Sequence, residues 1–166
     1  MRRLATISKR AAGSVPGVLL LLSVALLTQA CSDDAETPQQ EIRRFIDSAV
    51  AAGEQRSVDA LNELVHASFV DQQGRNRGEL ALLLRGYFFR NKNIHLFTRI
   101  DSIDILDDSQ ANVILHVAMA GSAIADVDAI ASLRARIYRF ELQLVKQQDW
   151  RLRHANWAPA SIGGFD

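Results

Sequence analysis

The hydrophobic residues of this chain change their spacing at about Asn91. Before that point they recur every three or four positions, the period of an amphipathic helix, and after it every second position, the period of a strand. Helices followed by a run of strands predict an α+β domain with the helices packed on one face of the sheet. We expect three N-terminal helices packed in a curved, mainly antiparallel, four-stranded sheet.

Three stretches carry the helical period: residues 41–53, residues 57–65 and residues 78–89. Gly53 ends the first, Ser57 is a plausible N-cap for the second, and Asn76 with Glu79 forms a capping box before the third. The third helix is rich in leucine and aromatic residues, so we expect it to be buried on much of its surface. Phe69 and Val70 are interpreted as leading into a turn-rich link, DQQGRNRG.

The strand pattern contains one visible irregularity. Ile94, Leu96, Thr98 and Ile100 alternate with His95, Phe97, Arg99 and Asp101, and the apolar positions then resume at Ile103 and Ile105, one step out of phase. Such a slip predicts a bulge or bend. The other strands are expected over residues 111–120, 134–146 and 150–157, with Pro159 closing the last, residues 121–132 as a loop or short helix, and residues 161–166 as a loose tail.

Side-chain direction on the last two strands follows from the period of two. Tyr138 and Phe140 are predicted on one face, and Arg139 on the other with Glu141. Trp150 and Trp157 are seven apart, which places them on opposite faces of a regular strand.

Residues 41–160 resemble the nuclear transport factor 2-like superfamily, also called SnoaL-like, which includes ketosteroid isomerase and scytalone dehydratase. The resemblance depends on the order of the elements, on Tyr87-Phe88 at the end of the third helix and on the turn Asp149-Trp150-Arg151-Leu152. It implies a cone-shaped cavity between sheet and helices. Because enzymes, ligand binders and protein-binding subunits share this fold, the resemblance leaves the function open.

The N-terminus has the three-part layout of a secretory signal. Four basic residues precede an uncharged run from Val15 to Leu27, and small residues follow at its exit. The run has about 13 residues, fewer than the roughly 20 that a membrane-crossing helix needs. We therefore interpret residues 1–30 as a cleaved signal peptide and residues 31–40 as a polar tether to a domain at 41–160.

Cys31, the only cysteine, follows that run directly. The stretch Leu26-Leu27-Thr28-Gln29-Ala30-Cys31 resembles the lipobox of bacterial lipoproteins, although Thr28 and Gln29 depart from the preferred pattern. The resemblance implies lipidation of Cys31 and, with Ser32 next, delivery to the outer membrane facing the periplasm. Asp33 and Asp34 leave retention in the inner membrane open, and an unmodified cysteine in an ordinary signal peptide is the alternative.

Charge and composition exclude several classes of protein. The 166 residues suffice for one domain, and from Cys31 onward 15 basic residues stand against 19 acidic ones, a net charge of −4. A nucleic-acid partner is therefore not expected. The chain lacks a glycine-rich phosphate loop, GxSxG and HExxH, so no cofactor is expected. His95, His116 and His154 are spread over separate strands, and no metal site is expected.

Candidate site residues follow from the implied cavity. Those expected to face it or to touch a ligand are His116, Tyr87, Tyr138, Phe140 and His95. The resemblance also implies a general base beside a tyrosine hydroxyl, for which Asp71 and His116 are the candidates. Each has a structural alternative, because Asp71 opens a polar turn and a buried His116 would need a hydrogen-bond partner in any case.

A second candidate surface is the terminal hairpin, where Arg139, Arg151, Arg153 and Trp157 are expected to present a partner-binding face, with Arg136 nearby. The leading hypothesis is a lipid-anchored, non-catalytic envelope protein. It would bind a small apolar or amphipathic molecule in the cavity, or a protein partner, with a homodimer left open. The alternative is a cofactor-independent isomerase or dehydratase with a His or Asp base in the cone.

Overall fold

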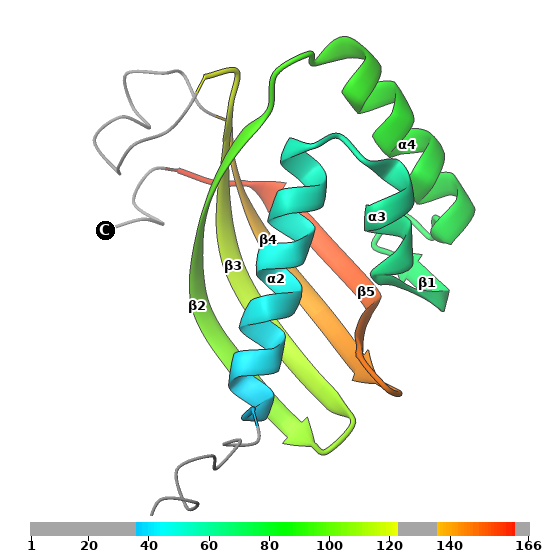
Figure 1. The fold of residues 1–166 in the computed structure, drawn as a ribbon, viewed down its shortest axis with the longest axis vertical. Coiled ribbons are helices and arrows are strands. Elements are labelled where there is room, and N and C mark those ends of the chain that lie inside the picture. The colour runs from blue at the N-terminus through cyan, green and yellow to red at the C-terminus, as the bar shows by residue number, and fades with distance from the viewer. Residues whose placement is uncertain (1–35, 123–135, 162–166) are drawn as a thin grey trace, which may run out of the picture. The chain divides into compact units, whose positions relative to one another are not determined.

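The computed structural model describes residues 36–122 and 136–161. Its helices are α2 (Pro38–Glu54), α3 (Val58–Glu63) and α4 (Arg77–Arg90). Its strands are β1 (Val65–Asp71), β2 (His95–Asp107), β3 (Gln110–Ala120), β4 (Arg136–Lys146) and β5 (Trp150–Pro159). They form one sheet in the order β1-β5-β4-β3-β2 (Figure 1). The predicted signal peptide with Cys31, most of the predicted 121–132 segment and the predicted tail beyond Ser161 lie outside the described residues.

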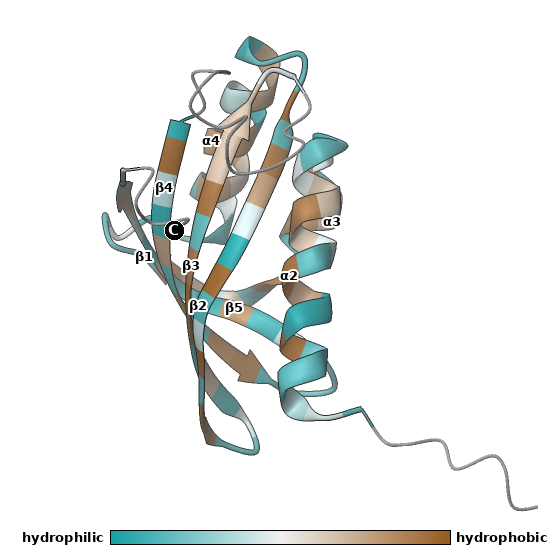
Figure 2. Cartoon of the chain, turned by 90° about the vertical axis from the view of Figure 1, so that its left-hand side faces the viewer, coloured by the Kyte–Doolittle hydropathy of each residue, from teal (hydrophilic) through white to brown (hydrophobic). Residues whose placement is uncertain are grey.

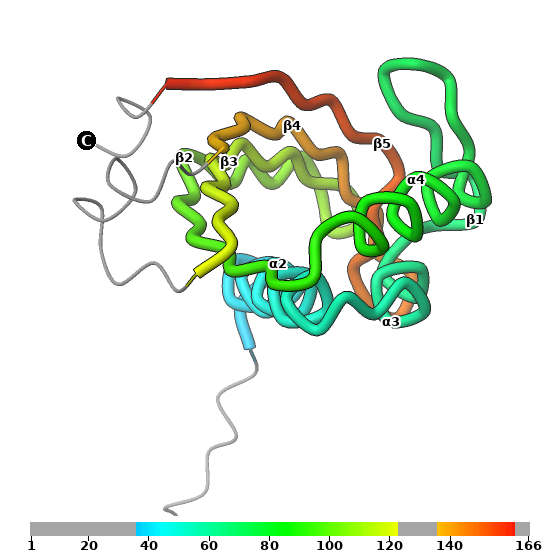
Figure 3. Tube along the Cα trace, turned by 90° about the horizontal axis from the view of Figure 1, so that it is seen from above, coloured from blue at the N-terminus to red at the C-terminus, as the bar shows by residue number. Residues whose placement is uncertain are grey.

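Helix α2 begins three residues earlier than predicted, because its start is capped. The Thr37 side chain accepts from Gln40 N–H, Gln40 reaches back to the Thr37 backbone, and Pro38 occupies the first turn. Ile42, Phe45 and Ile46 are buried against the sheet. The sheet arches over α2, which lies in its hollow (Figure 3).

The core lies between α2 and one face of the sheet. Strand β3 contributes every second residue, Ala111, Val113, Leu115 and Val117, all of them buried. The alternation of hydrophobic and hydrophilic residues along the strands is visible in Figure 2. The described core is supplied by residues between Ile42 and Trp157, all of which lie in the unit 36–166.

The bulge predicted in β2 is confirmed. The pairing of β2 with β3 shifts between Ile100 and Ser102, so Asp101 is the extra residue. Ile100 and Ile103 therefore both face the core although they are three apart.

The prediction of four strands is wrong, because the sheet has five. The segment interpreted as the end of the second helix and a link contains β1, which pairs in parallel with β5. Val65, Phe69 and Asp71 are its buried residues. Helix α3 accordingly ends at Glu63, two residues before Val65.

A second bulge, in β5, was not predicted and overturns the expected direction of the tryptophans. The register opposite β4 passes from His154 to Leu152, which leaves Arg153 as the extra residue. Trp150 and Trp157 therefore lie on the same face of the sheet, the face that carries the core. The regular period of two does not hold across this position.

Helix α4 is less buried than expected. Its capping box at Asn76 and Glu79 is confirmed, but only Ala81 and Phe88 are buried within it. Leu82, Leu83 and Phe89 are exposed by 63%, 39% and 78%. The helix packs mainly on α3 and β1 and leaves its other side uncovered among the described residues.

Candidate ligand-binding face

An aromatic row lies on the helix-facing side of β4 and β5. Phe140 and Trp157, which are register partners, stack with ring centroids 6.1 Å apart and an interplanar angle of 28°. Tyr138 continues the row, with its centroid 6.4 Å from that of Phe140. All three residues are half-buried. Stacked rings of this kind offer a flat apolar surface to a ligand.

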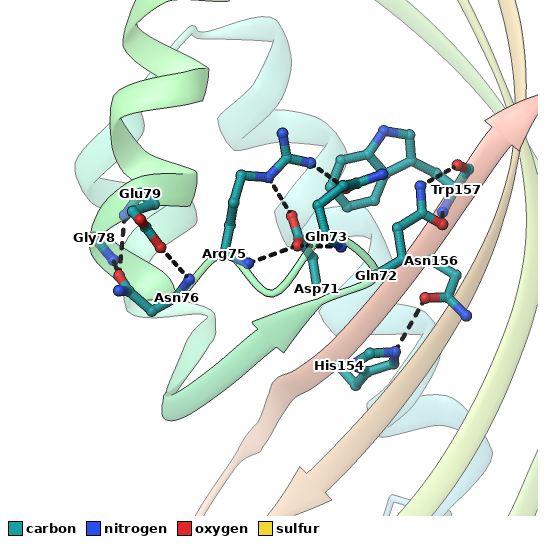
Figure 4. A network of polar contacts seen from close by, with 10 residues as sticks. All are labelled: Asp71, Gln72, Gln73, Arg75, Asn76, Gly78, Glu79, His154, Asn156 and Trp157. Carbon is teal, nitrogen blue, oxygen red and sulfur yellow. Dashed lines mark hydrogen bonds and ion pairs between the residues drawn. The ribbon is translucent and has the colours of Figure 1, made fainter.

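Arg75 closes one end of the aromatic row. Its guanidinium carbon lies 5.2 Å from the centroid of the Trp157 ring, a cation–π distance (Figure 4). Asp71 Oδ2 accepts from Arg75 Nε at 2.6 Å, which fixes the guanidinium in this place. The pair couples the turn after β1 to the ring face on β5.

Asp71 is buried and fully used by its own turn. Its Oδ1 accepts from the backbone N–H groups of Gln73 and Arg75, both at 2.9 Å. Burial alone would raise the pKa of Asp71, but the hydrogen bonds from Arg75 and Gln73 outweigh it and hold that pKa below its ordinary value. A carboxylate with a lowered pKa is a weak base, and all the contacts of Asp71 stabilise its own turn. Asp71 therefore has the environment of a structural group.

Gln72 extends the sheet with its side chain. Its Nε2 donates to the Trp157 carbonyl at 2.8 Å, and its Oε1 accepts from the Trp157 N–H at 3.2 Å. This two-point contact imitates a strand pairing beyond the end of β1 and holds the Trp157 backbone (Figure 4). Neither Gln72 nor Arg75 was predicted, because both act on a tryptophan more than 80 residues away and no local pattern records that contact.

Tyr87 lines a small polar pocket at the C-terminal end of α4. The pocket has a volume of about 140 Å³ and is also lined by Asn91, Met119 and Arg136. The Tyr87 hydroxyl donates to Met119 Sδ at 3.7 Å, a weak contact. Arg136 precedes Tyr138 by two residues on the same face of β4, so the pocket lies on the same side of the sheet as the aromatic row.

His116 lies on the other face of the sheet. Its neighbours Leu115 and Val117 are in the core, so its own side chain points away from α2. His116 Nδ1 lies 2.9 Å from Asp101 Oδ2, and Asp101 Oδ1 accepts from Arg99 Nε at 3.3 Å. The bulge at Asp101 brings this carboxylate to the histidine, which is how a histidine with only 9% exposure is accommodated.

The candidates are thus divided between two faces. Tyr138 and Phe140 lie on the concave face, whereas the pairing register places His95 and His116 on the convex one. Arg139 also faces outward, where it pairs with Glu141, and Arg151 has the same direction. Trp157 is on the concave side, so the structure does not gather it with Arg139, Arg151 and the bulge residue Arg153 into one partner-binding face.

His95, His116 and His154 share the convex face but occupy distant register positions on β2, β3 and β5. Within residues 36–122 and 136–161, no group of three or more His, Cys, Asp or Glu side chains is arranged to hold a metal ion. In the same described ranges, no helix has the length and hydropathy to cross a membrane.

A second pocket, of about 230 Å³, lies at the N-terminal end of α2 and is lined by charged residues of both signs. Glu41 Oε2 accepts from Lys146 Nζ at 2.5 Å and from Trp150 Nε1 at 2.9 Å. The bond from Lys146, more than that from Trp150, lowers the pKa of Glu41 against the opposing effect of burial. These contacts join the first turn of α2 to β4 and β5, which gives the pocket a structural explanation.

No protein-family model matches the sequence, and no curated protein does. Solved structures do resemble the fold. A candidate scytalone dehydratase of Novosphingobium aromaticivorans superposes with a TM-score of 0.61 at 14% identity, over 74% of this chain and 84% of that one. A ketosteroid isomerase-like protein of Erwinia carotovora gives 0.55 at 14% identity, over 72% and 94%.

Bd1075 of Bdellovibrio bacteriovorus gives a TM-score of 0.60 at 14% identity, over 74% of this chain but 41% of that one. This chain therefore spans less than half of the Bdellovibrio protein. At such identities the similarity concerns the fold alone, which is nuclear transport factor 2-like, as the resemblance in the sequence implied.

Proposed function

We propose that this chain, with its nuclear transport factor 2-like fold, is a lipid-anchored envelope protein that binds a small apolar or amphipathic molecule without transforming it. The observation that carries the proposal is the half-exposed aromatic row of Tyr138, Phe140 and Trp157 on the concave face. Aromatic side chains that are only half-buried and lie side by side on one face offer apolar area to a ligand at little cost in side-chain ordering.

The positions of the two candidate bases favour binding over catalysis. Asp71 is occupied by three hydrogen bonds, and His116 lies on the convex face beside Asp101. A general base must reach the proton it removes from a bound molecule, within about 3.2 Å or through one water. His116 does not meet that requirement for a molecule lying on the aromatic row, because it faces the other side of the sheet, and the carboxylate of Asp71 is already engaged. An isomerase or dehydratase remains the alternative and would need another base.

The binding proposal is tested with a neutral fluorescent naphthylamine probe. Phe140→Leu removes a ring from the centre of the row, and we expect it to weaken probe binding about tenfold, because part of the stacking surface is lost. Phe97→Leu makes the same change on the convex face and serves as the matched control, with unchanged affinity expected. Equal affinities in both variants and the original protein would contradict the proposal.

The proposed lipid anchor is tested at Cys31, the only cysteine of the chain. We expect the protein to incorporate radioactive palmitate in a bacterial host. Globomycin blocks the peptidase that cleaves lipoprotein signal peptides, so we expect the uncleaved precursor to accumulate in its presence. Cys31→Ser should abolish the label, whereas Ser32→Ala should keep it. Labelling that persists in Cys31→Ser would overturn the lipid anchor and leave the binding face untouched.

A further inference from the structure

The side of α4 turned away from the domain is apolar. Leu82, Gly86 and Phe89 follow one another at intervals of four and three residues, so they form one stripe along the helix, with Leu83 at its edge. Phe89 is exposed by 78% and Leu82 by 63%, the two highest values among the described residues with large apolar side chains. Water-exposed Phe and Leu on one stripe indicate a contact surface.

Basic residues flank this stripe. Arg85 and Arg90 are exposed on the same side of the helix, and Lys92 places its ammonium 5.3 Å from the centroid of the Phe89 ring. No ion pair joins Arg85, Arg90 or Lys92 to a carboxylate in the described part of the chain. The single acidic residue of α4, Glu79, lies in its first turn and is engaged by the Asn76 N–H.

We propose that this surface of α4, formed by Leu82, Leu83 and Phe89 with Arg85, Arg90 and Lys92, docks on an anionic lipid bilayer. Apolar side chains beside uncompensated cations are the composition of helices that lie in a membrane interface. The surface carries three cations and no anion although the chain from Cys31 onward has a net charge of −4, so it is complementary to anionic lipid.

The short tether between Cys31 and α2 supports a lipid bilayer as the partner of the α4 surface. Thr37, the N-cap of α2, follows Cys31 by six positions, a length of chain that spans about 20 Å when fully extended. If Cys31 carries the proposed lipid, Thr37 cannot lie further than this from the bilayer. A small apolar surface then suffices, because tethering raises its effective concentration at the membrane. This step alone rests on the proposed anchor.

A second copy of the chain fits this surface less well. A two-fold contact would bring Arg85, Arg90 and Lys92 of one protomer towards those of its partner, and like charges repel. Three large apolar side chains, interrupted by Gly86, also offer little towards the roughly 800 Å² that each partner buries in a stable interface.

The inference is tested by flotation of the body 36–166, which has its own core and lacks Cys31, with lipid vesicles. We expect it to bind vesicles of phosphatidylethanolamine and phosphatidylglycerol at least tenfold more tightly than vesicles of phosphatidylcholine. The double variant Leu82→Ser, Phe89→Ser should lose at least tenfold of that affinity, since both side chains are exposed and their replacement leaves the core intact. Circular dichroism checks the fold.

Leu106→Ser is the matched control, because Leu106 is exposed by 61% but lies on β2. It should bind vesicles like the original body, and Arg85→Glu with Arg90→Glu should remove the preference for anionic lipid. Absence of vesicle binding, or equal binding by all variants, overturns the inference. So does a dimer in sedimentation that the double variant abolishes while no variant floats. Because the body lacks Cys31, these outcomes are independent of the palmitate experiment.

Discussion

Asp71 shows how one residue can look catalytic in a sequence and be structural in a fold. A carboxylate next to a predicted cavity is a reasonable candidate base, but this one accepts from two backbone N–H groups and from the Arg75 guanidinium. With 2% exposure it cannot exchange these partners for water. Its role is to hold Arg75 against the Trp157 ring.

Replacing this carboxylate should therefore cost stability. Asp71→Asn keeps an oxygen for the turn but loses the charge opposite Arg75, and we expect a decrease of about 2 kcal/mol in the free energy of unfolding at pH 7. Because the folded-state pKa of Asp71 is lowered, its stabilisation is present above the ordinary value of 3.8 and is lost as the pH falls through the lowered one. Urea unfolding of Asp71→Asn and of the original protein, at pH 7 and at a pH below the lowered pKa, measures the difference in their free energies of unfolding.

Below that range the two proteins should become equally stable. Asp108→Asn, at an exposed turn position, is the control and should unfold like the original protein at either pH. A deficit in Asp71→Asn that is as large in acid as at pH 7 would show that the charge is not responsible.

At the level of single residues, the sequence predicts side chains whose direction depends on a local period. Tyr138 and Phe140 are placed together because a regular strand alternates, and β4 is regular there. The contact of Arg75 with Trp157 depends on how β1 meets β5, and that pairing joins segments more than 80 residues apart. His116 was uncertain for the same reason, since both faces of β3 are apolar in sequence and only the sheet order shows which one α2 covers.

Among the elements, β5 depends most on an irregularity. Its bulge at Arg153 returns Trp150 and Leu152 to the same face as Ala155 and Trp157. Trp150 is 4% exposed and donates to Glu41. The bulge therefore determines both the core at the start of β5 and the aromatic row at its end.

The bulge should tolerate a change of side chain and not a change of length. Arg153→Ala is expected to alter the free energy of unfolding by no more than about 0.5 kcal/mol, because the side chain is exposed. Deleting Arg153 would turn Trp150 and Leu152 to the convex face and should cost about 3–5 kcal/mol, as for loss of a buried tryptophan. Thermal unfolding of both proteins compares them, and similar melting temperatures would refute this role of the bulge.

The bulges at Asp101 and Arg153 also show why one irregularity was predicted and another was not. In β2 the slip separates runs of clear alternation, so the displaced isoleucines record it. In β5 only Ala155 and Trp157 mark the apolar face after the bulge. Two positions are too few to show that the alternation has shifted. Strand β1 was missed because three of its seven residues are buried and Val65 continues the period of the preceding helix.

At the scale of the whole molecule, the sheet separates two surfaces with different chemistry. The concave face carries the aromatic row and the pocket at Tyr87. The convex face carries Arg99, Asp101 and His116 together with Arg139 and Glu141. The proposed apolar ligand would contact only the concave face, so the charged residues of the convex face take no part in that proposal.

The most direct test of ligand binding on the concave face is native mass spectrometry of the body 36–166, exported behind a cleavable signal peptide of the bacterial host and purified gently from its periplasm. The proposed function predicts a fraction with the mass of one chain plus a small molecule, which organic extraction removes and which Phe140→Leu reduces. A bare chain in every preparation, or an adduct that is retained equally in Phe140→Leu, would contradict it.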